Sequence, residues 1–222
     1  MAWHALTGPQ ADLATWSDDR RAVRYRRGVS PICAVEDTDG QAWAALADLA
    51  GQRGVAALFR RDLGPSPPEW AELFREEVIQ YVAESLPPPP PDLDLVELGP
   101  ADAEEMLALA VLTEPGPFSI ETHRTGRYFG LRRNGALVAM AGERMRIGGW
   151  GEVSAVCVHP TAQRQGLGAA LTLAAAKAIT DRGDRALLHV RERNDAAHEL
   201  YRKLGFAART TITVGIFRRS KD

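Results

Sequence analysis

The sequence is poor in cysteine and has no long apolar segment. Its 222 residues include only Cys33 and Cys157, which excludes a disulfide framework and favours a reducing compartment. The uncharged stretch from Gly166 to Ala176 is far shorter than the roughly 20 residues of a membrane-spanning helix. Residues 1–4 do not begin a signal peptide, because no basic region is followed by an apolar one. We therefore expect a cytoplasmic protein without a membrane partner.

An excess of charge of either sign is also missing. The 27 basic and 29 acidic residues give a net charge of −2, which disfavours nucleic acid as a partner. The charge is unevenly spread, however. Residues 1–92 carry nine arginines against 14 acidic residues, a net of −5, whereas residues 93–222 carry 18 basic and 15 acidic residues, a net of +3. An anionic ligand is expected in the second part, and no metal is predicted.

Five consecutive prolines, Pro87 to Pro91, give the strongest linker signal. Each proline fixes φ and lacks an N–H, so the run should form a stiff, extended spacer. We predict a small α/β lobe at residues 1–86, a linker at 87–92 and a second domain at 93–222. In the first lobe the patterns predict strands at 22–27, 31–36 and 54–59, a helix at 41–50, and a helix or strand at 70–82.

The second domain alternates between strand and helix patterns. Asn134-Gly135 is a strong hairpin signal between two apolar runs. Pro100 is suited to the first turn of a helix. The predicted strands are 93–98, 128–133, 137–145, 152–158, 186–190 and about 212–216, and the predicted helices start at 100 and span 167–180 and 196–204. The pattern indicates an α/β domain.

A glycine-rich turn follows the strand at 152–158. The strand stops at Pro160, and a Q-x-x-G-x-G sequence at residues 163–168 then opens a helix. Glycines at 166 and 168 remove Cβ atoms where backbone N–H groups would approach a ligand, and the helix start adds a partial positive charge. The turn is suited to a phosphate or pyrophosphate, with Arg164 as a further cation. The same residues also fit a simple turn before a helix.

A second motif lies at residues 194–206. Asn194 and Tyr201 are seven residues apart, so they share one face of a helix that Gly205 would end before Phe206 resumes a strand. Taken alone, this is also the pattern of an amphipathic helix with an Asn cap and a core tyrosine.

Together, Val158-His159-Pro160, the Q-x-x-G-x-G turn and the string from Asn194 to Phe206 resemble the GNAT superfamily of acyl-CoA-dependent N-acetyltransferases. The stretch at 137–145 is similar to the glycine N-acyltransferase-like branch. The resemblance implies a mixed central sheet with a V-shaped splay between two parallel strands, 152–158 and 186–190, preceded by the smaller α/β lobe. It also implies acetyl-CoA as cosubstrate.

The resemblance assigns roles to individual residues. The pyrophosphate would lie on the backbone amides of the turn, the pantetheine would contact the end of the strand, and Asn194 would approach from the far side. Tyr201 matches the acid that protonates the departing thiolate, and Glu152 is the first candidate base, with Glu143 second. Both carboxylates could instead be partners of nearby arginines. The implied cofactor-binding residues are Val156, Cys157, Val158, Gln163, Arg164, Gln165, Gly166, Leu167, Gly168, Ala169 and Asn194.

The function implied is transfer of an acetyl group to the primary amine of a small molecule or amino-acid-like acceptor, by direct attack. The loop from Glu114 to Tyr128 would shape the acceptor site. His159 and His189 end central strands, but neither is assigned a catalytic role. The alternative is a catalytically silent acyl-CoA-binding module with a partner-binding N-terminal lobe. A homodimer is left open.

Overall fold

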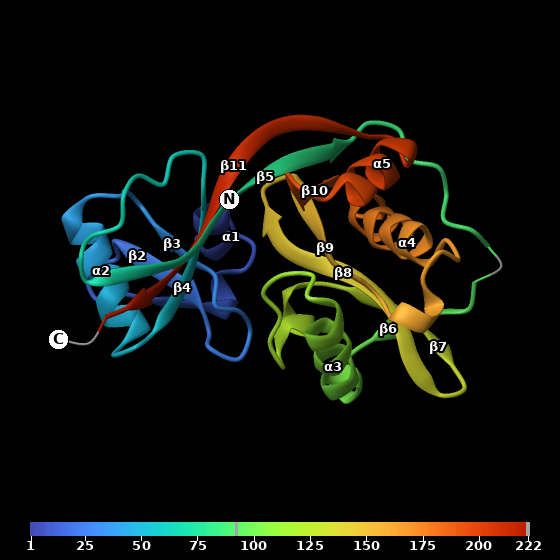
Figure 1. The fold of residues 1–222 in the computed structure, drawn as a ribbon, viewed down its shortest axis with the longest axis horizontal. Helices are drawn as coiled ribbons and strands as arrows, with labels where there is room; N and C mark the ends of the chain where they lie inside the picture. The colour runs from blue at the N-terminus through green and yellow to red at the C-terminus, as the bar shows by residue number, and fades with distance from the viewer. Residues whose placement is uncertain (92, 221–222) are drawn as a thin grey trace.

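An eight-stranded mixed sheet forms the centre of the computed structural model, which describes residues 1–91 and 93–220 (Figure 1). Asp92, the last residue of the predicted linker, lies outside the described residues. The pairs are antiparallel except β9 with β10. The predicted mixed α/β fold is confirmed. In spatial order the strands are β4 (Val55–Arg60), β11 (Phe206–Arg219), β5 (Trp70–Ala83), β10 (Arg185–Arg191), β9 (Trp150–Val158), β8 (Ala136–Ile147), β7 (Tyr128–Arg133) and β6 (Leu95–Leu98).

Helices cover both faces of the β6–β10 part of this sheet. α3 (Ala103–Thr113) packs on β8 and β9 from one side, and α4 (Leu167–Asp181) packs on β7 to β10 from the other. α5 (Asp195–Lys203) contacts β11 beside α4 (Figure 1). Two separate apolar clusters result, one beneath α4 and α5 and one beneath α3.

The first residues form a second, three-stranded sheet, β1 (Ala14–Trp16), β2 (Ala22–Tyr25) and β3 (Cys33–Val35). α1 (Ala2–Leu6) and α2 (Gly40–Ala50) flank it. The carboxylate of Asp39 caps α2 by accepting from the Ala42 amide at 2.8 Å. Trp43 of α2 then packs on the large sheet, against Trp70 and Phe217. Short 3-10 helices lie at Ala11–Leu13, Pro100–Asp102, Thr122–Thr125 and Pro160–Ala162.

The large sheet continues across the predicted boundary at residues 87–92. β4 and β5 precede the boundary, yet β11 lies between them and pairs with both. Residues 87–90 contain neither helix nor strand and link β5 to β6. The proline run therefore does not separate two sheets, and the division into folding units stays a prediction. Among the described residues, no helix is long and apolar enough to cross a membrane.

Candidate active site

The parallel pair β9 and β10 splays apart after three residues. Arg185, Ala186 and Leu187 pair with residues 150–152, and the strands then diverge. A bulge in β9 accompanies the splay: β8 pairs with Ser154 and next with Cys157, and Ala155 has a φ of +51°. The bulge shifts the alternation of side chains along β9, so residues after it point to the opposite face from the one that regular pairing would give them. The V-shaped opening predicted for these strands is confirmed.

A cavity of about 230 Å³ lies in this opening. Its walls come from β8, β9, β10, α5 and the end of α3 with the residues that follow it. Of the predicted site residues, the cavity brings together Val156, Asn194 and Tyr201. Cys157 faces the other way, into the cluster beneath α3, and its burial raises its pKa to about 11. The lining also includes Thr113, Glu114, Pro115, Arg144, Ser154, His189, Arg191 and Ala197.

The glycine-rich turn lies at the end of β9. Arg164 and Gly166 adopt positive φ values of +59° and +75°, and α4 begins at Leu167. The N–H groups of residues 167–169 have no partner one turn earlier within the helix, because α4 starts there. A Cβ built on Gly168 would lie 3.7 Å from Val158 Cγ2. The free amides are therefore adjacent to the strand that lines the cavity.

Other side chains of the turn make local contacts. Gln165 Oε1 accepts a hydrogen bond from Arg133 Nη2 at 2.6 Å, and Gln163 Nε2 lies 3.5 Å from the carbonyl oxygen of Val158. Ala169 follows in the first turn of α4 and packs partly buried on the core. These contacts hold the turn to both β7 and β9. Arg164 itself is exposed.

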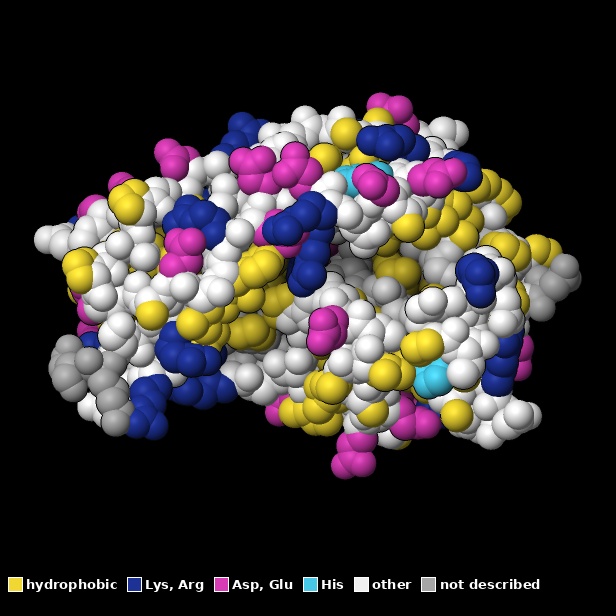
Figure 2. Space-filling view, viewed as in Figure 1, with side chains coloured by type: hydrophobic (Ala, Val, Ile, Leu, Met, Phe, Trp, Pro, Cys, Tyr) yellow, Lys and Arg dark blue, Asp and Glu magenta, His cyan; other side chains and the backbone are white. Residues whose placement is uncertain are grey.

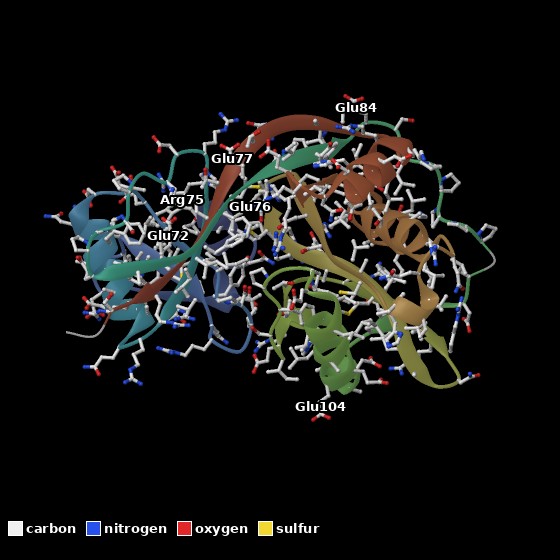
Figure 3. The ribbon with its side chains drawn as sticks, viewed as in Figure 1. Glu72, Arg75, Glu76, Glu77, Glu84 and Glu104 are labelled. Carbon is white, nitrogen blue, oxygen red and sulfur yellow. The ribbon has the colours of Figure 1, made fainter. Side chains whose placement is uncertain are left out.

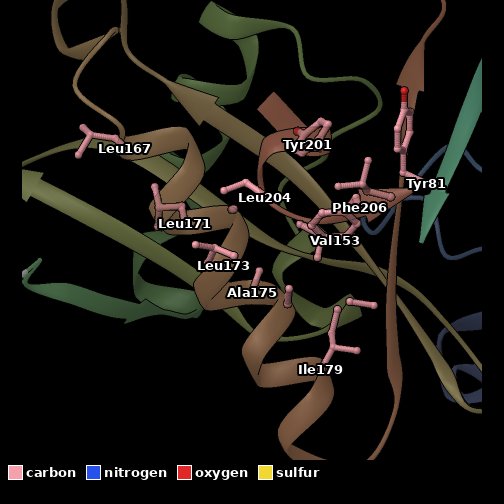
Figure 4. Close-up of a cluster of buried hydrophobic side chains, with 14 of the residues drawn as sticks. Tyr81, Val153, Leu167, Leu171, Leu173, Ala175, Ile179, Tyr201, Leu204 and Phe206 are labelled. Carbon is pink, nitrogen blue, oxygen red and sulfur yellow. The ribbon is translucent and has the colours of Figure 1, made fainter. Parts of the chain in front are cut away.

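Tyr201 lies on α5, within the apolar cluster beneath α4 and α5 (Figure 4), and also lines the cavity. It is 9% exposed and packs edge-on against Phe206. Burial raises the pKa of the phenol to about 12, although a hydrogen bond with Thr172 opposes the shift. The hydroxyl therefore keeps its proton at neutral pH. Asn194 caps the same helix, with its Oδ1 accepting from the Ala197 amide at 3.1 Å.

Glu152 is fully buried and is held by two basic side chains. Arg144 makes a bidentate pair with it, at 3.0 Å and 2.5 Å, and His189 Nδ1 lies 2.7 Å from Oε1. Burial alone would raise the pKa of Glu152, but Arg144 and His189 outweigh it and lower the pKa to about 2. The carboxylate is therefore charged at neutral pH and is a weak base.

Glu143, the second candidate base, and His189, which was assigned no catalytic role, are also engaged by neighbouring side chains. His189 has partners at both ring nitrogens, because Gln80 Nε2 lies 3.1 Å from its Nε2. Glu143 is buried and pairs with Arg182. The pairs Glu152–Arg144 and Glu143–Arg182 agree with the alternative that the two carboxylates are partners of arginines. Sequence reasoning allowed Arg144 as a partner of Glu152 but missed the contact with His189, because no local spacing brings residues 152 and 189 together.

A mixed sheet with one splayed parallel pair, and a helix that begins at the end of the splay, define the fold class of GNAT acyltransferases. Comparison with known proteins agrees. A family model described as FR47-like protein matches residues 128–214. A crystal structure from Novosphingobium aromaticivorans, assigned by its description to GNAT acetyltransferases, is 35% identical and has a TM-score of 0.90. The match covers 99% of this chain and 96% of that one. This chain belongs to the GNAT family of acetyltransferases.

Two curated relatives match over shorter stretches. Mycothiol acetyltransferase of Paenarthrobacter aurescens is 53% identical over 57 residues, which is 25% of this chain and 18% of that protein. The enzyme of the same name from Thermobispora bispora is 47% identical over 70 residues, which is 31% of this chain and 23% of that protein. The chain thus spans less than a quarter of each relative's length. The glycine N-acyltransferase-like branch is not confirmed by these comparisons.

Proposed function

We propose that this protein transfers an acetyl group from acetyl-CoA to the primary amine of a small molecule by direct attack. The observation that carries the proposal is the cavity in the splay, because β9, the N-cap residue Asn194 of α5 and Tyr201 all border it. GNAT acetyltransferases use acetyl-CoA, and the residues present fit that molecule.

The fit rests on the turn and on the splayed strand. Residues 166 and 168 carry no Cβ, and the amides of residues 167–169 are free of helical partners, so a pyrophosphate could approach them closely. Arg164 supplies positive charge on an exposed residue. Residues 156–158 of β9 have no strand partner on the splayed side, which leaves backbone groups for a pantetheine amide. Asn194 would contact it from α5.

Acetyl-CoA supplies an activated acetyl group as a thioester. The acceptor amine must lose a proton before its lone pair can form the N–C bond, and the C–S bond then breaks. In the proposed mechanism Tyr201 gives its proton to the departing sulfur, and its pKa of about 12 leaves the phenol protonated at neutral pH. The new amide nitrogen sheds a second proton, solvent reprotonates Tyr201, and each turnover releases one proton from an ammonium acceptor. An N–H near Val158 would stabilise the carbonyl oxygen.

Glu152 enters this proposal in a different way from the one the sequence suggested. With a pKa of about 2, and with Arg144 and His189 as hydrogen-bond partners, it is poorly suited to take the first proton directly. We propose that it positions Arg144 and His189 beside the cavity that both side chains line.

The alternative of a silent binding module is not favoured by the family match. Mycothiol acetylation, the activity in the curated relatives' names, is one version of the proposed chemistry, because it also acetylates a small molecule. The relatives match over less than a third of this chain, so their acceptor is not carried over here.

The test measures acetyl-CoA binding and turnover separately. Acetyl-CoA should raise the melting temperature, and an amine panel should release free CoA thiol in step with acetylated product. Binding without turnover on any amine would favour the silent module. Absence of a thermal shift at millimolar acetyl-CoA would refute the proposed function itself.

A further inference from the structure

A second cavity, of about 490 Å³, lies between the N-terminal strands and α3. We define it as the apolar groove. It shares two residues with the splay cavity, Glu114 and Arg191, and so the two spaces meet at one carboxylate and one guanidinium. Figure 2 shows hydrophobic side chains gathered in the hollow between the β4 end of the molecule and α3, with charged side chains at its edge. Its apolar walls include Val55, Ala57, Leu107, Val111, Phe118 and Ile216.

The charged pair at the junction matches a zwitterion. Glu114 follows α3, is exposed and can attract an ammonium group. Arg191 ends β10, and its side chain is 55% exposed. Its Nε lies 3.5 Å from Oε2 of Glu76 on β5, a residue labelled in Figure 3. That separation is longer than a bidentate pair, so the guanidinium keeps donors for a second carboxylate.

We propose that the acetyl acceptor is an α-amino acid with an apolar side chain. Its ammonium group would face Glu114, its carboxylate would face Arg191, and its side chain would fill the apolar groove. This inference rests on the proposed function, because it places the amine beside the splay cavity that would hold the thioester. Burial of an apolar side chain in a preformed groove supplies affinity, and the two charges fix the orientation of the amine.

The groove also argues against strongly polar acceptors. One wall of the groove is formed by Val55 and Ala57 of β4, Ile216 of β11 and the neighbouring Pro31. α3 supplies the opposite wall. A hydroxyl-rich acceptor would lose hydrogen bonds to water on entering the groove. Among the described lining residues, Glu114 and Arg191 alone have polar side chains that could replace those hydrogen bonds. A sugar-bearing amine is therefore a poorer fit than leucine or phenylalanine.

The experiment uses the full chain with acetyl-CoA and four acceptors: phenylalanine, phenethylamine, glycine and glucosamine. We expect kcat/KM for phenylalanine to exceed that for each of the others by about tenfold or more. Arg191→Gln should raise KM for phenylalanine about 10- to 100-fold and leave KM for phenethylamine unchanged, because only phenylalanine has a carboxylate. Glu114→Gln should weaken both, because both carry an ammonium group.

Two matched controls separate the groove from general surface effects. Arg193 contacts the same Glu76 at 3.7 Å but lines neither cavity, so Arg193→Gln should leave every KM unchanged. Val111 and Leu112 are exposed neighbours on α3, and only Val111 lines the groove. Val111→Asp should raise KM for phenylalanine about tenfold, whereas Leu112→Asp should not.

Each result decides the matter. Equal kcat/KM for glucosamine and phenylalanine, or an equal effect of Arg191→Gln and Arg193→Gln, would overturn the inference. Thermal stabilisation by acetyl-CoA with no transfer to any of the four acceptors would also overturn it, while leaving the acetyl-CoA site in place. Loss of acetyl-CoA binding would instead refute the proposed function, and the inference with it.

Discussion

Replacement of Tyr201 by phenylalanine tests the proton donor directly. The ring and its contact with Phe206 stay, and only the hydroxyl is lost. We expect kcat to fall 10- to 1000-fold, roughly 1.4 to 4 kcal/mol in activation free energy, with little change in acetyl-CoA affinity. Folding should lose only about 1 kcal/mol, because a single buried hydroxyl is removed.

Tyr81 provides a matched control within the same apolar cluster (Figure 4). It is fully buried, its hydroxyl lies 2.9 Å from His198 Nδ1, and it does not line the cavity. Tyr81→Phe should therefore cost a similar amount of stability and leave kcat unchanged. Comparison of the two variants by urea unfolding separates a catalytic loss from a general weakening of the core.

The assay follows thiol release at saturating acetyl-CoA, over a range of pH. Because burial raises the pKa of Tyr201 to about 12, the phenol stays protonated and should cause no fall in kcat between pH 7 and 10. Equal kcat for Tyr201→Phe and Tyr81→Phe at matched folding would refute the reasoning and return Tyr201 to a structural role.

Three other substitutions address the cofactor site and the buried charges. Gly168→Asp should abolish the stabilisation by acetyl-CoA, about 2.7 kcal/mol at 100 times Kd, whereas Gly148→Asp, in open space, should retain it in a thermal-shift assay. Glu152→Gln should lower the free energy of unfolding by roughly 3 to 5 kcal/mol, against at most about 1 kcal/mol for the exposed Glu97→Gln. Because the pKa of Glu152 is lowered, its contribution is complete above pH 4.5 and is lost toward pH 2, so urea titrations should show the Glu152→Gln deficit shrinking in that range. Asn194→Ala should cost about 1 kcal/mol of stability and raise the Kd for acetyl-CoA in calorimetry, since the cap also borders the cavity.

Local chemistry made much of the fold predictable. Asn134 and Gly135 take the positive φ values, +51° and +85°, that a tight hairpin requires, and β7 and β8 flank them as predicted. The seven-residue spacing of Asn194 and Tyr201 does bring both to one cavity. These features depend on residues close in sequence, so pattern alone could identify them.

Long-range pairing was not predictable in the same way. The proline run suggested a boundary, but β5 pairs with β11 through residues such as Tyr81 and Ala208, which are far apart in sequence. Segment 70–82 was ambiguous because its pattern of exposure is irregular. The five-residue α1 and the three-residue β1 are too short to show a period. At the site, the sequence allowed an arginine partner for Glu152 but gave no sign of the contact with His189.

The position of β11 between β4 and β5 has a consequence for the order of folding. During synthesis β4 and β5 are made long before residues 206–219, and the strand that joins them side by side does not yet exist. The edges of β4 and β5 that pair with β11 therefore stay unpaired and exposed to other chains until residues 206–219 have left the ribosome. Closure of contacts this distant in sequence is slow. The protein should therefore gain its stability late and in one cooperative step, and chaperones that shield strand edges should raise its folding yield.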